Sequence, residues 1–214
     1  MAAWDEGKPV GKTIILVPHG GQSDYREWRD WFHFGLQKPP GTSWVEVTGL
    51  TLTTARTKLV HEALKSSPEY LFWLDDDVIA PNNIISILIS HNLPIVCGLY
   101  MAKKKKEDRG LAAWMHPQNW SGKDGYLPIM LEQSNRFIQV DVTGLGCALM
   151  RADIFNKLSM PWFEWAADGM SEDFYFFEKV NKELGIKPVI DMDMKCDHIG
   201  NFKVNCHGEF TTVG

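Results

Sequence analysis

The hydrophobic pattern of the chain centres on an apolar run at residues 70–74 that stops at three consecutive carboxylates. The run reads Tyr-Leu-Phe-Trp-Leu, and Asp75, Asp76 and Asp77 follow it directly. A short continuous apolar run is typical of a strand buried on both faces of a sheet. Three adjacent acids are too costly to bury unpaired. We therefore expect the strand to end at Asp75, with its carboxyl end opening into a cleft where ligands bind in open α/β sheets.

The apolar segments around this strand predict an alternation of strands and helices. Strands are expected at residues 13–19, 44–48 and 94–98. Helices are expected from Asp24 to Leu36, from Thr53 or Thr54 to Leu64, and after Pro81 as far as His91. This order predicts an α/β fold with a mostly parallel sheet and helices on both faces.

The second half of the chain has a looser pattern. A strand is expected at residues 137–142, followed by a glycine-rich apolar segment at 143–150 and a short helix at 153–158. Another helix is expected to start at residues 171–173 and to end at Gly185, which suits a helix C-cap. A last strand is expected at 188–193. No linker divides the chain, so residues 1–214 are expected to form a single domain.

Composition excludes some classes of function. The chain has 214 residues, is 44% hydrophobic and carries a formal net charge of −5, which disfavours nucleic acid as a partner. No apolar run reaches membrane-spanning length and no secretory signal is visible, so a cytoplasmic location is expected. The four lysines 103–106 are interpreted as a solvated loop or, alternatively, as a basic flap near phosphates.

The acids at 75–77 have two interpretations from the residues alone. Clustered carboxylates are ligands that Mg²⁺ or Mn²⁺ prefers, which indicates a divalent cation site. The alternative is an acidic turn after the strand, in which Asp77 caps the helix that follows Pro81. The pattern of apolar residues does not decide between them.

Six segments in order resemble a known family. They are Thr54-Ala-Arg-Thr, Phe72-Trp-Leu-Asp-Asp-Asp-Val, Ile95-Val-Cys-Gly-Leu-Tyr100, Gly144-Leu-Gly-Cys-Ala-Leu-Met-Arg-Ala-Asp-Ile-Phe155, Ser171-Glu-Asp-Phe and Asp197-His-Ile-Gly200. Together they resemble nucleotide-sugar glycosyltransferases of the GT-A (Rossmann-like) fold, most like the family-2 type. The resemblance extends from residue 13 to about 200. It implies a nucleotide-binding half at 10–100 and an acceptor-side half with a C-terminal flap at 101–214.

The resemblance implies a metal site made by three residues. Asp75 and Asp77 match the family's Asp-x-Asp, in which the last acid binds Mn²⁺ or Mg²⁺ and the first contacts metal or ribose. Asp76 could also reach the ribose. His198 matches a late histidine that is often a further metal ligand; the alternative is an ordinary polar residue at a strand end. A cation on both phosphates would stabilise the departing nucleoside diphosphate.

The pair Glu172-Asp173 resembles the family's Glu-Asp pair, one member of which deprotonates the acceptor hydroxyl. Adjacent helical residues point about 100° apart, so only one is expected to face the cleft. The resemblance favours Asp173, and a carboxylate base implies an inverting reaction. The alternative is that both acids only complement the helix dipole.

The resemblance also implies contacts to the donor. Arg56 is placed near the nucleotide and diphosphate, with a surface salt bridge to Glu62 or a neighbour as its alternative. Pro18 and His19 end the first strand where the family places the base. Gly144 permits close approach of the backbone to the sugar, with a tight turn as its alternative. Lys203 could touch the diphosphate from the flap.

The substrates stay open in part. UDP is favoured, but many relatives read uracil with an acid after the second strand, whereas Glu46 is expected either inside that strand or at its end, so GDP also fits. The acceptor is a glycan, lipid or protein, and Trp162 and Trp165 either stack on its sugar or, as packing favours, belong to the core. The oligomeric state is not indicated. Two alternatives are a nucleotide-sugar or carbohydrate binder without turnover and a sugar nucleotidyltransferase, although Pro18-His-Gly-Gly21 lacks the basic residues of the latter's loop.

Overall fold

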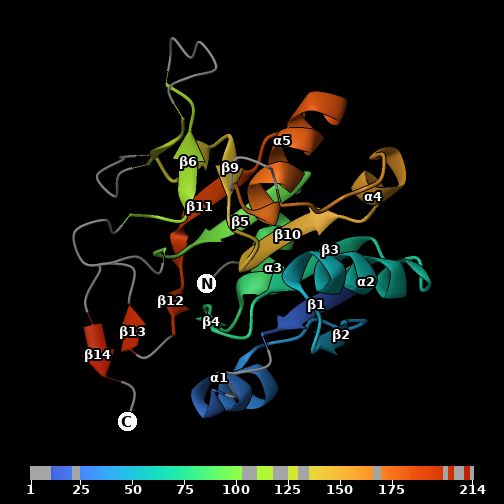
Figure 1. The fold of residues 1–214 in the computed structure, drawn as a ribbon. Coiled ribbons are helices and arrows are strands. Elements are labelled where there is room, and N and C mark those ends of the chain that lie inside the picture. The colour runs from blue at the N-terminus through green and yellow to red at the C-terminus, as the bar shows by residue number, and fades with distance from the viewer. Residues whose placement is uncertain are drawn as a thin grey trace.

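A seven-stranded sheet forms the centre of the computed structural model (Figure 1). The structure describes residues 11–20, 25–102, 110–117, 125–129, 135–165 and 170–199, and the backbone of 202–204 and 210–212. The strand order is β2-β1-β3-β10-β5-β11-β8. The strands are β1 (Thr13–His19), β2 (Ser43–Thr48), β3 (Tyr70–Leu74), β5 (Ile95–Leu99), β8 (Phe137–Gln139), β10 (Cys147–Arg151) and β11 (Val189–Lys195).

The direction of the strands confirms a mixed, mostly parallel α/β sheet. Strand β1 runs parallel to both β2 and β3, and β5 runs parallel to β11. Strand β10 is inserted antiparallel between β3 and β5, and β8 is antiparallel at the edge. The carboxyl ends of β1, β3 and β5 therefore meet at one edge of the sheet, beside the start of β10.

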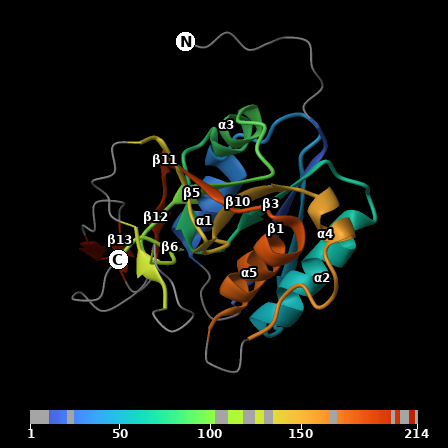
Figure 2. The same ribbon diagram turned by 90° about the horizontal axis from the view of Figure 1, so that it is seen from above.

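Helices cover both faces of this sheet (Figure 2). One apolar core lies under α2 (Leu52–Leu64), α4 (Asp153–Lys157) and α5 (Glu172–Leu184). The other lies under α1 (Arg26–Asp30), the π-helical turn η1 (Trp31–Gly35) and α3 (Ile84–Ser90). None of the helices in the described ranges combines the length and hydrophobicity that crossing a bilayer requires.

The ends of two helices follow from local chemistry. Ser171 is the N-cap residue of α5, and Gly185 ends the helix in the left-handed conformation, with φ of 66°, as expected for a glycine C-cap. Helix α2 begins earlier than predicted, because Thr51 is its N-cap residue in place of Thr53 or Thr54. The Thr51 hydroxyl bonds to that of Thr54 at 2.9 Å, which ties the first turn together.

Two small sheets extend the edge of the central one. The first has the order β14-β13-β12-β4, and the second β7-β6-β9. Their strands are β4 (Val78–Ile79), β12 (Asp197–His198), β13 (Phe202–Val204), β14 (Phe210–Thr212), β6 (Ala113–Met115), β7 (Leu127–Pro128) and β9 (Val142–Thr143).

The prediction of a single strand at residues 137–142 is wrong. The chain divides there into β8, in the central sheet, and β9, in a small sheet. Asp141 lies at the division: its backbone N–H donates to the carbonyl of Trp114 at 3.0 Å, and its carboxylate accepts hydrogen bonds from Lys187 at 2.6 Å and from the backbone N–H of His116 at 2.7 Å. Because these partners are distant in sequence and hold Asp141 in place, the chain leaves the central sheet after β8 and enters the small sheet at β9.

Candidate active site

The three predicted acids lie where β3 ends. All five residues of β3 are buried, and the backbone N–H of Asp75 donates to the carbonyl of Gly146 at 3.1 Å. The chain then turns and enters β4. The alternative in which Asp77 caps the next helix is wrong, because Asn83 is the N-cap residue of α3. The carbonyl of Asp77 instead accepts the N–H of Ile199 at 2.7 Å.

Pairing of β12 with β4 brings His198 to the acids. His198 is the register partner of Val78, and its Nε2 lies 3.4 Å from Oδ1 of Asp77. Its Nδ1 lies 2.7 Å from the carbonyl oxygen of Met101. Because a carbonyl only accepts, Nδ1 must carry a proton, which leaves the lone pair of a neutral imidazole on Nε2. The residue that the sequence places about 120 positions after Asp77 therefore faces it directly.

Arg56 crosses beneath the acids as a buried cation. It is only 2% exposed, and its Nε donates to Oε1 of Glu172 at 3.0 Å while Nη2 lies 3.4 Å from Oδ1 of Asp75. The alternative, a surface salt bridge to Glu62 or a neighbour, is wrong because Arg56 is buried with Glu172, and Glu62 pairs with Lys65 at 2.7 Å. Arg56 thus connects the end of β3 to the start of α5.

The electrostatics of Asp75 are unfavourable in this state. Burial raises its pKa to about 6, and the neighbouring charge of Asp77 adds to the increase, while Arg56 acts in the opposite direction. A raised pKa means that the ionised carboxylate lacks sufficient compensation from its surroundings. Such a carboxylate is a candidate ligand for a cation.

The two acids at the start of α5 diverge, as the helix geometry predicts. Glu172 is 2% exposed and is held in the ion pair with Arg56. Oδ1 of Asp173 accepts hydrogen bonds from the Ser171 hydroxyl and, at 2.8 Å, from the N–H of Phe174. Oδ2 of Asp173 faces Gly144, at 3.6 Å from the point where a Cβ on that glycine would stand. Burial raises the pKa of Asp173, and the charge of Glu172 raises it further.

A second cluster forms at the carboxyl ends of β1 and β2. Nδ1 of His19 lies 3.0 Å from Oδ2 of Asp76, and its Nε2 lies 3.5 Å from Oε2 of Glu46. The hydrogen bond to Asp76 raises the pKa of His19, and Glu46 contributes in the same direction. Glu46 does lie inside β2, paired with Val17, yet its side chain still reaches this cluster. Pro18 precedes His19 in β1 and pairs with Val47.

Tyr100 is a site residue that sequence reasoning missed. It follows β5 directly, is 6% exposed, and its ring meets that of His198 edge-on with centroids 5.3 Å apart. Its hydroxyl accepts the N–H of Gly146 at 2.9 Å. A usable signal was its place at the carboxyl end of a predicted buried strand, the same position that marked Asp75.

Some predicted residues do not join this cluster. Trp162 is buried, packs on Phe155 and donates its Nε1 hydrogen to the carbonyl of Leu158 at 3.2 Å, so it belongs to the core. Trp165 is 59% exposed. Lys203 has its backbone in β13, but its side chain lies outside the described part of the chain, as do lysines 103–106.

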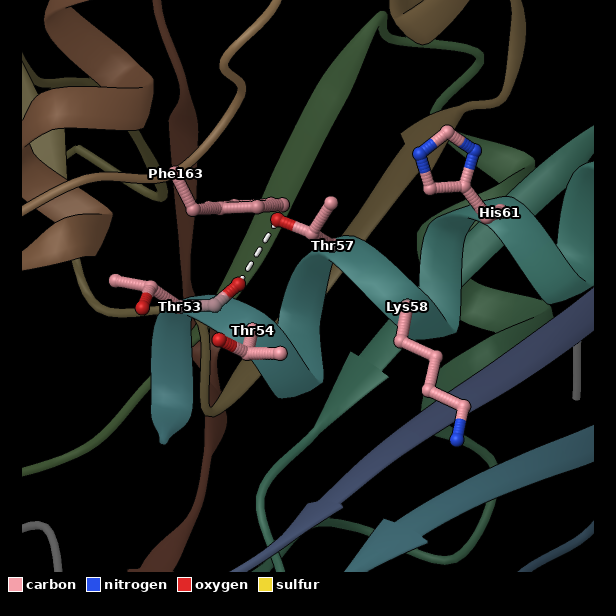
Figure 3. Close-up of a pocket in the computed structure, with 6 residues that line it drawn as sticks. All are labelled: Thr53, Thr54, Thr57, Lys58, His61 and Phe163. Carbon is pink, nitrogen blue, oxygen red and sulfur yellow. Dashed lines mark hydrogen bonds between the residues drawn. The ribbon is translucent and has the colours of Figure 1, made fainter. Parts of the chain in front are cut away.

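A separate pocket of about 360 Å³ lies on the outer side of α2 (Figure 3). It is lined by Thr53, Thr54, Thr57, Lys58, His61 and Phe163. The Thr57 hydroxyl donates to the carbonyl of Thr53 at 2.8 Å, so this hydroxyl is already used inside the helix. None of the acids at the end of β3 lines this pocket.

The residues at the end of β3 fit a divalent cation in their chemistry. Among the residues that the structure describes, no three metal-binding side chains are assembled around one point. However, Nε2 of His198 lies 3.4 Å from Oδ1 of Asp77, and a neutral His198 with its proton on Nδ1 would share a cation with that carboxylate. Imidazole held through its other nitrogen by a carbonyl is the usual support for a metal ligand.

Comparison with known proteins reveals the fold. No family model matches the chain, and no curated protein sequence matches it. The structure of A197 from STIV is similar, with a TM-score of 0.67 at 18% identity, over 95% of this chain and 94% of that one. The structure of GalNAc-T7 with UDP, GalNAc and Mn²⁺ matches with a TM-score of 0.54 at 12% identity, over 89% of this chain but 44% of the longer chain. The protein therefore has a GT-A-like fold.

Proposed function

We propose that the protein is a metal-dependent glycosyltransferase that moves a sugar from a nucleotide-sugar donor, with UDP favoured, to an acceptor hydroxyl. The observation that carries the proposal is the convergence at one edge of the sheet: Asp75 and Asp77 with His198, and beside them Asp173. The shared fold with GalNAc-T7, whose structure contains UDP, GalNAc and Mn²⁺, supports the class of donor and of metal.

Asp75, Asp77 and His198 would hold the cation. When bound, Mn²⁺ or Mg²⁺ supplies positive charge to the diphosphate that leaves. The chain itself prepares this position, because Met101 fixes the ring of His198 and Arg56 holds Asp75 from below. Arg56 is engaged by two carboxylates, so we assign it the positioning of Asp75 and Glu172 in place of a direct contact with phosphate.

Asp173 would act as the base. Its Oδ1 accepts hydrogen bonds from Ser171 and Phe174, which orient the carboxylate, and its Oδ2 faces Gly144. The raised pKa makes it a stronger base than an exposed aspartate. With Asp173 activating the acceptor hydroxyl for a single direct displacement, the reaction would invert the configuration at the anomeric carbon. Glu172 stays in its buried ion pair and takes no part in proton transfer.

The cluster of His19, Asp76 and Glu46 would bind the nucleoside. It lies at the carboxyl ends of β1 and β2, next to Pro18, and combines carboxylate acceptors with an imidazole. A carboxylate can accept from ribose hydroxyls or from a base N–H. Gly144 and Lys203 of β13 remain candidates for contacts with the sugar and with the diphosphate, respectively.

The test is a panel of UDP- and GDP-sugars, each with and without Mn²⁺, read by thermal shift and by release of nucleoside diphosphate. Asp173→Asn should keep the metal-dependent thermal shift and lower release about 10²–10⁴-fold, the usual contribution of a general base. Asp77→Ala should abolish the metal-dependent shift. Asp153→Asn is the matched control, because Asp153 is also an acid in the first turn of a helix but pairs with Lys157 on the surface.

Two results would contradict the proposal. Binding of a nucleotide sugar without any release of diphosphate would identify a binding protein on the same fold. Release of pyrophosphate from a nucleoside triphosphate and a sugar phosphate would identify a nucleotidyltransferase. Normal release by Asp173→Asn would leave the class of enzyme intact and remove only the assignment of the base.

A further inference from the structure

Gly144 and Tyr100 compete for the same space. A Cβ added to Gly144 would stand 2.1 Å from the hydroxyl oxygen of Tyr100, far inside any allowed contact. The same point lies 3.6 Å from Oδ2 of Asp173. The glycine is therefore needed at this position because the phenol occupies the place of a side chain, and the phenol and the carboxylate face one point beside it.

The hydrogen bonds of Tyr100 leave its proton available. The hydroxyl oxygen accepts the N–H of Gly146, and among the hydrogen bonds of the described residues Tyr100 donates none. A tyrosine hydroxyl is ordinarily protonated at neutral pH and can donate one hydrogen bond while it accepts another.

The carboxylate of Asp173 complements the Tyr100 hydroxyl, because a carboxylate accepts hydrogen bonds. Oδ1 of Asp173 already accepts from Ser171 and Phe174, whereas Oδ2 is the oxygen turned toward Gly144. One group thus offers a proton and the other accepts one. A hydroxyl or a water molecule satisfies both, because its oxygen accepts while its own proton is donated.

We propose that Tyr100 and Asp173 together hold the attacking hydroxyl, with Tyr100 donating a hydrogen bond to its oxygen and Asp173 accepting its proton. This role rests on the proposed function. In the reaction the O–H bond of the acceptor breaks and its proton moves to Oδ2 of Asp173. The acceptor oxygen bonds to the anomeric carbon, and the bond from that carbon to the diphosphate breaks, with the electron pair leaving on the nucleoside diphosphate. Tyr100 keeps its proton throughout and acts by orienting the oxygen.

The test uses water as the acceptor, so that no acceptor needs to be known. UDP release from UDP-glucose, UDP-galactose and UDP-N-acetylglucosamine is measured with Mn²⁺ for the wild-type chain and for Tyr100→Phe. We expect kcat to fall about tenfold in Tyr100→Phe, the usual result of losing one well-placed hydrogen bond. KM for the donor should change less than twofold, because the donor is held by other residues. Tyr70→Phe is the control, since Tyr70 is also buried but begins β3 at the opposite end of the strand.

A second pair of variants separates orientation from simple packing. Gly144→Ala should lower kcat to a similar extent, because its methyl group displaces the Tyr100 hydroxyl. The double variant Tyr100→Phe with Gly144→Ala should melt at a higher temperature than Gly144→Ala alone and lose no more kcat than either single variant, because the two changes remove one interaction.

Each outcome decides the role. An unchanged kcat in Tyr100→Phe overturns it. A loss in which KM rises and the melting temperature falls in parallel with kcat also overturns it, since that pattern identifies a brace for the Gly144–Gly146 turn. A wild-type chain that releases no UDP from any donor overturns the proposed function itself, and this is distinguished by the wild-type measurement alone.

Discussion

Two aspartates of the central sheet have opposite surroundings: Asp191 is buried within a strand, and Asp75, whose side chain is 28% exposed, directly follows a strand. Asp191 of β11 is fully buried, and its carboxylate accepts hydrogen bonds from Arg136 at 3.1 and 3.2 Å and from the N–H of Asp193 at 3.0 Å, with Nε2 of His91 at 2.7 Å. Burial alone would raise its pKa, but these hydrogen bonds outweigh burial and lower the pKa below its ordinary value. Asp191 is a satisfied charge.

Asp75 of the candidate site is the contrasting case. Its recorded side-chain partner is Arg56 at 3.4 Å, Asp77 and Glu172 add negative charge nearby, and its pKa rises to about 6. The fold thus places several hydrogen-bond donors around Asp191 and leaves the charge of Asp75 poorly compensated. A satisfied acid stabilises the structure. An acid whose charge is poorly compensated, here called the strained acid, marks a place where a bound ligand would supply the missing positive charge.

The largest effect should follow from removing the satisfied acid. Asp191→Ala leaves His91 and the N–H of Asp193 without their acceptor, and we expect it to cost about 2–4 kcal/mol of unfolding free energy. For a chain of this length that lowers the melting temperature by roughly 5–15 °C. Thermal denaturation measures it, and the rate per folded molecule should stay unchanged.

Asp193→Ala is the matched control for this change. Asp193 pairs with the same Arg136 at 3.2 Å, but its side chain is 62% exposed. Exposed ion pairs contribute little, so the cost should stay below about 1 kcal/mol. Equal losses for Asp191→Ala and Asp193→Ala would contradict the idea that burial and multiple donors distinguish Asp191.

The strained acid should give the opposite result. Asp75→Asn removes a poorly compensated charge, so we expect the melting temperature in EDTA to stay the same or to rise. Release of UDP should fall on the order of 10²-fold or more, as when an electrostatic contact at a reacting centre is lost. A loss of stability similar to that of Asp191→Ala would instead identify Asp75 as a structural counterion of Arg56.

The sequence predicted the strained acids better than the satisfied one. The apolar run that ends at Asp75 is a local signal. The angle between neighbouring helical residues predicted that Glu172 and Asp173 point in different directions, while the preference for Asp173 came from the resemblance. Asp191 pairs with His91, which is 100 residues away in the chain, and no local pattern encodes that contact.

Other features depended on topology that the pattern could not supply. Tyr100 reaches Gly146 because β10 is inserted antiparallel next to β5, and residues 137–142 divide because Asp141 finds partners in a different sheet. Glu46 joins His19 although it lies inside β2. In each case the deciding contact joins segments whose spacing in the chain carries no signal.

A bound cation should compensate the negative charges of Asp75 and Asp77. Mn²⁺ at ten times its dissociation constant should raise the unfolding free energy of the wild-type chain by about 1.4 kcal/mol, or the melting temperature by about 3–6 °C. Asp77→Asn should remove this gain, whereas Asp191→Ala should retain it in full. An equal gain in wild type and Asp77→Asn would place the cation elsewhere.

The smallest effect is a difference in how pH acts on the two acids, measured in EDTA by urea denaturation between pH 7 and pH 3. The pKa of Asp75 in the folded chain, about 6, exceeds its ordinary value of 3.8, so the ionised form weakens the fold above pH 6 and the penalty disappears as pH falls toward 3.8. The stability advantage expected of Asp75→Asn over wild type should therefore be greatest at pH 7 and vanish near pH 4.

The pH dependence expected for Asp191 is opposite in sign, because its pKa is lowered in the folded chain. The stabilisation by Asp191 is fully present above its ordinary pKa and is lost as pH falls through the folded value. The deficit of Asp191→Ala should accordingly stay constant from pH 7 to pH 5 and shrink only below about pH 4. If both differences changed over the same pH range, the two carboxylates would be equally compensated and the contrast between them would be lost.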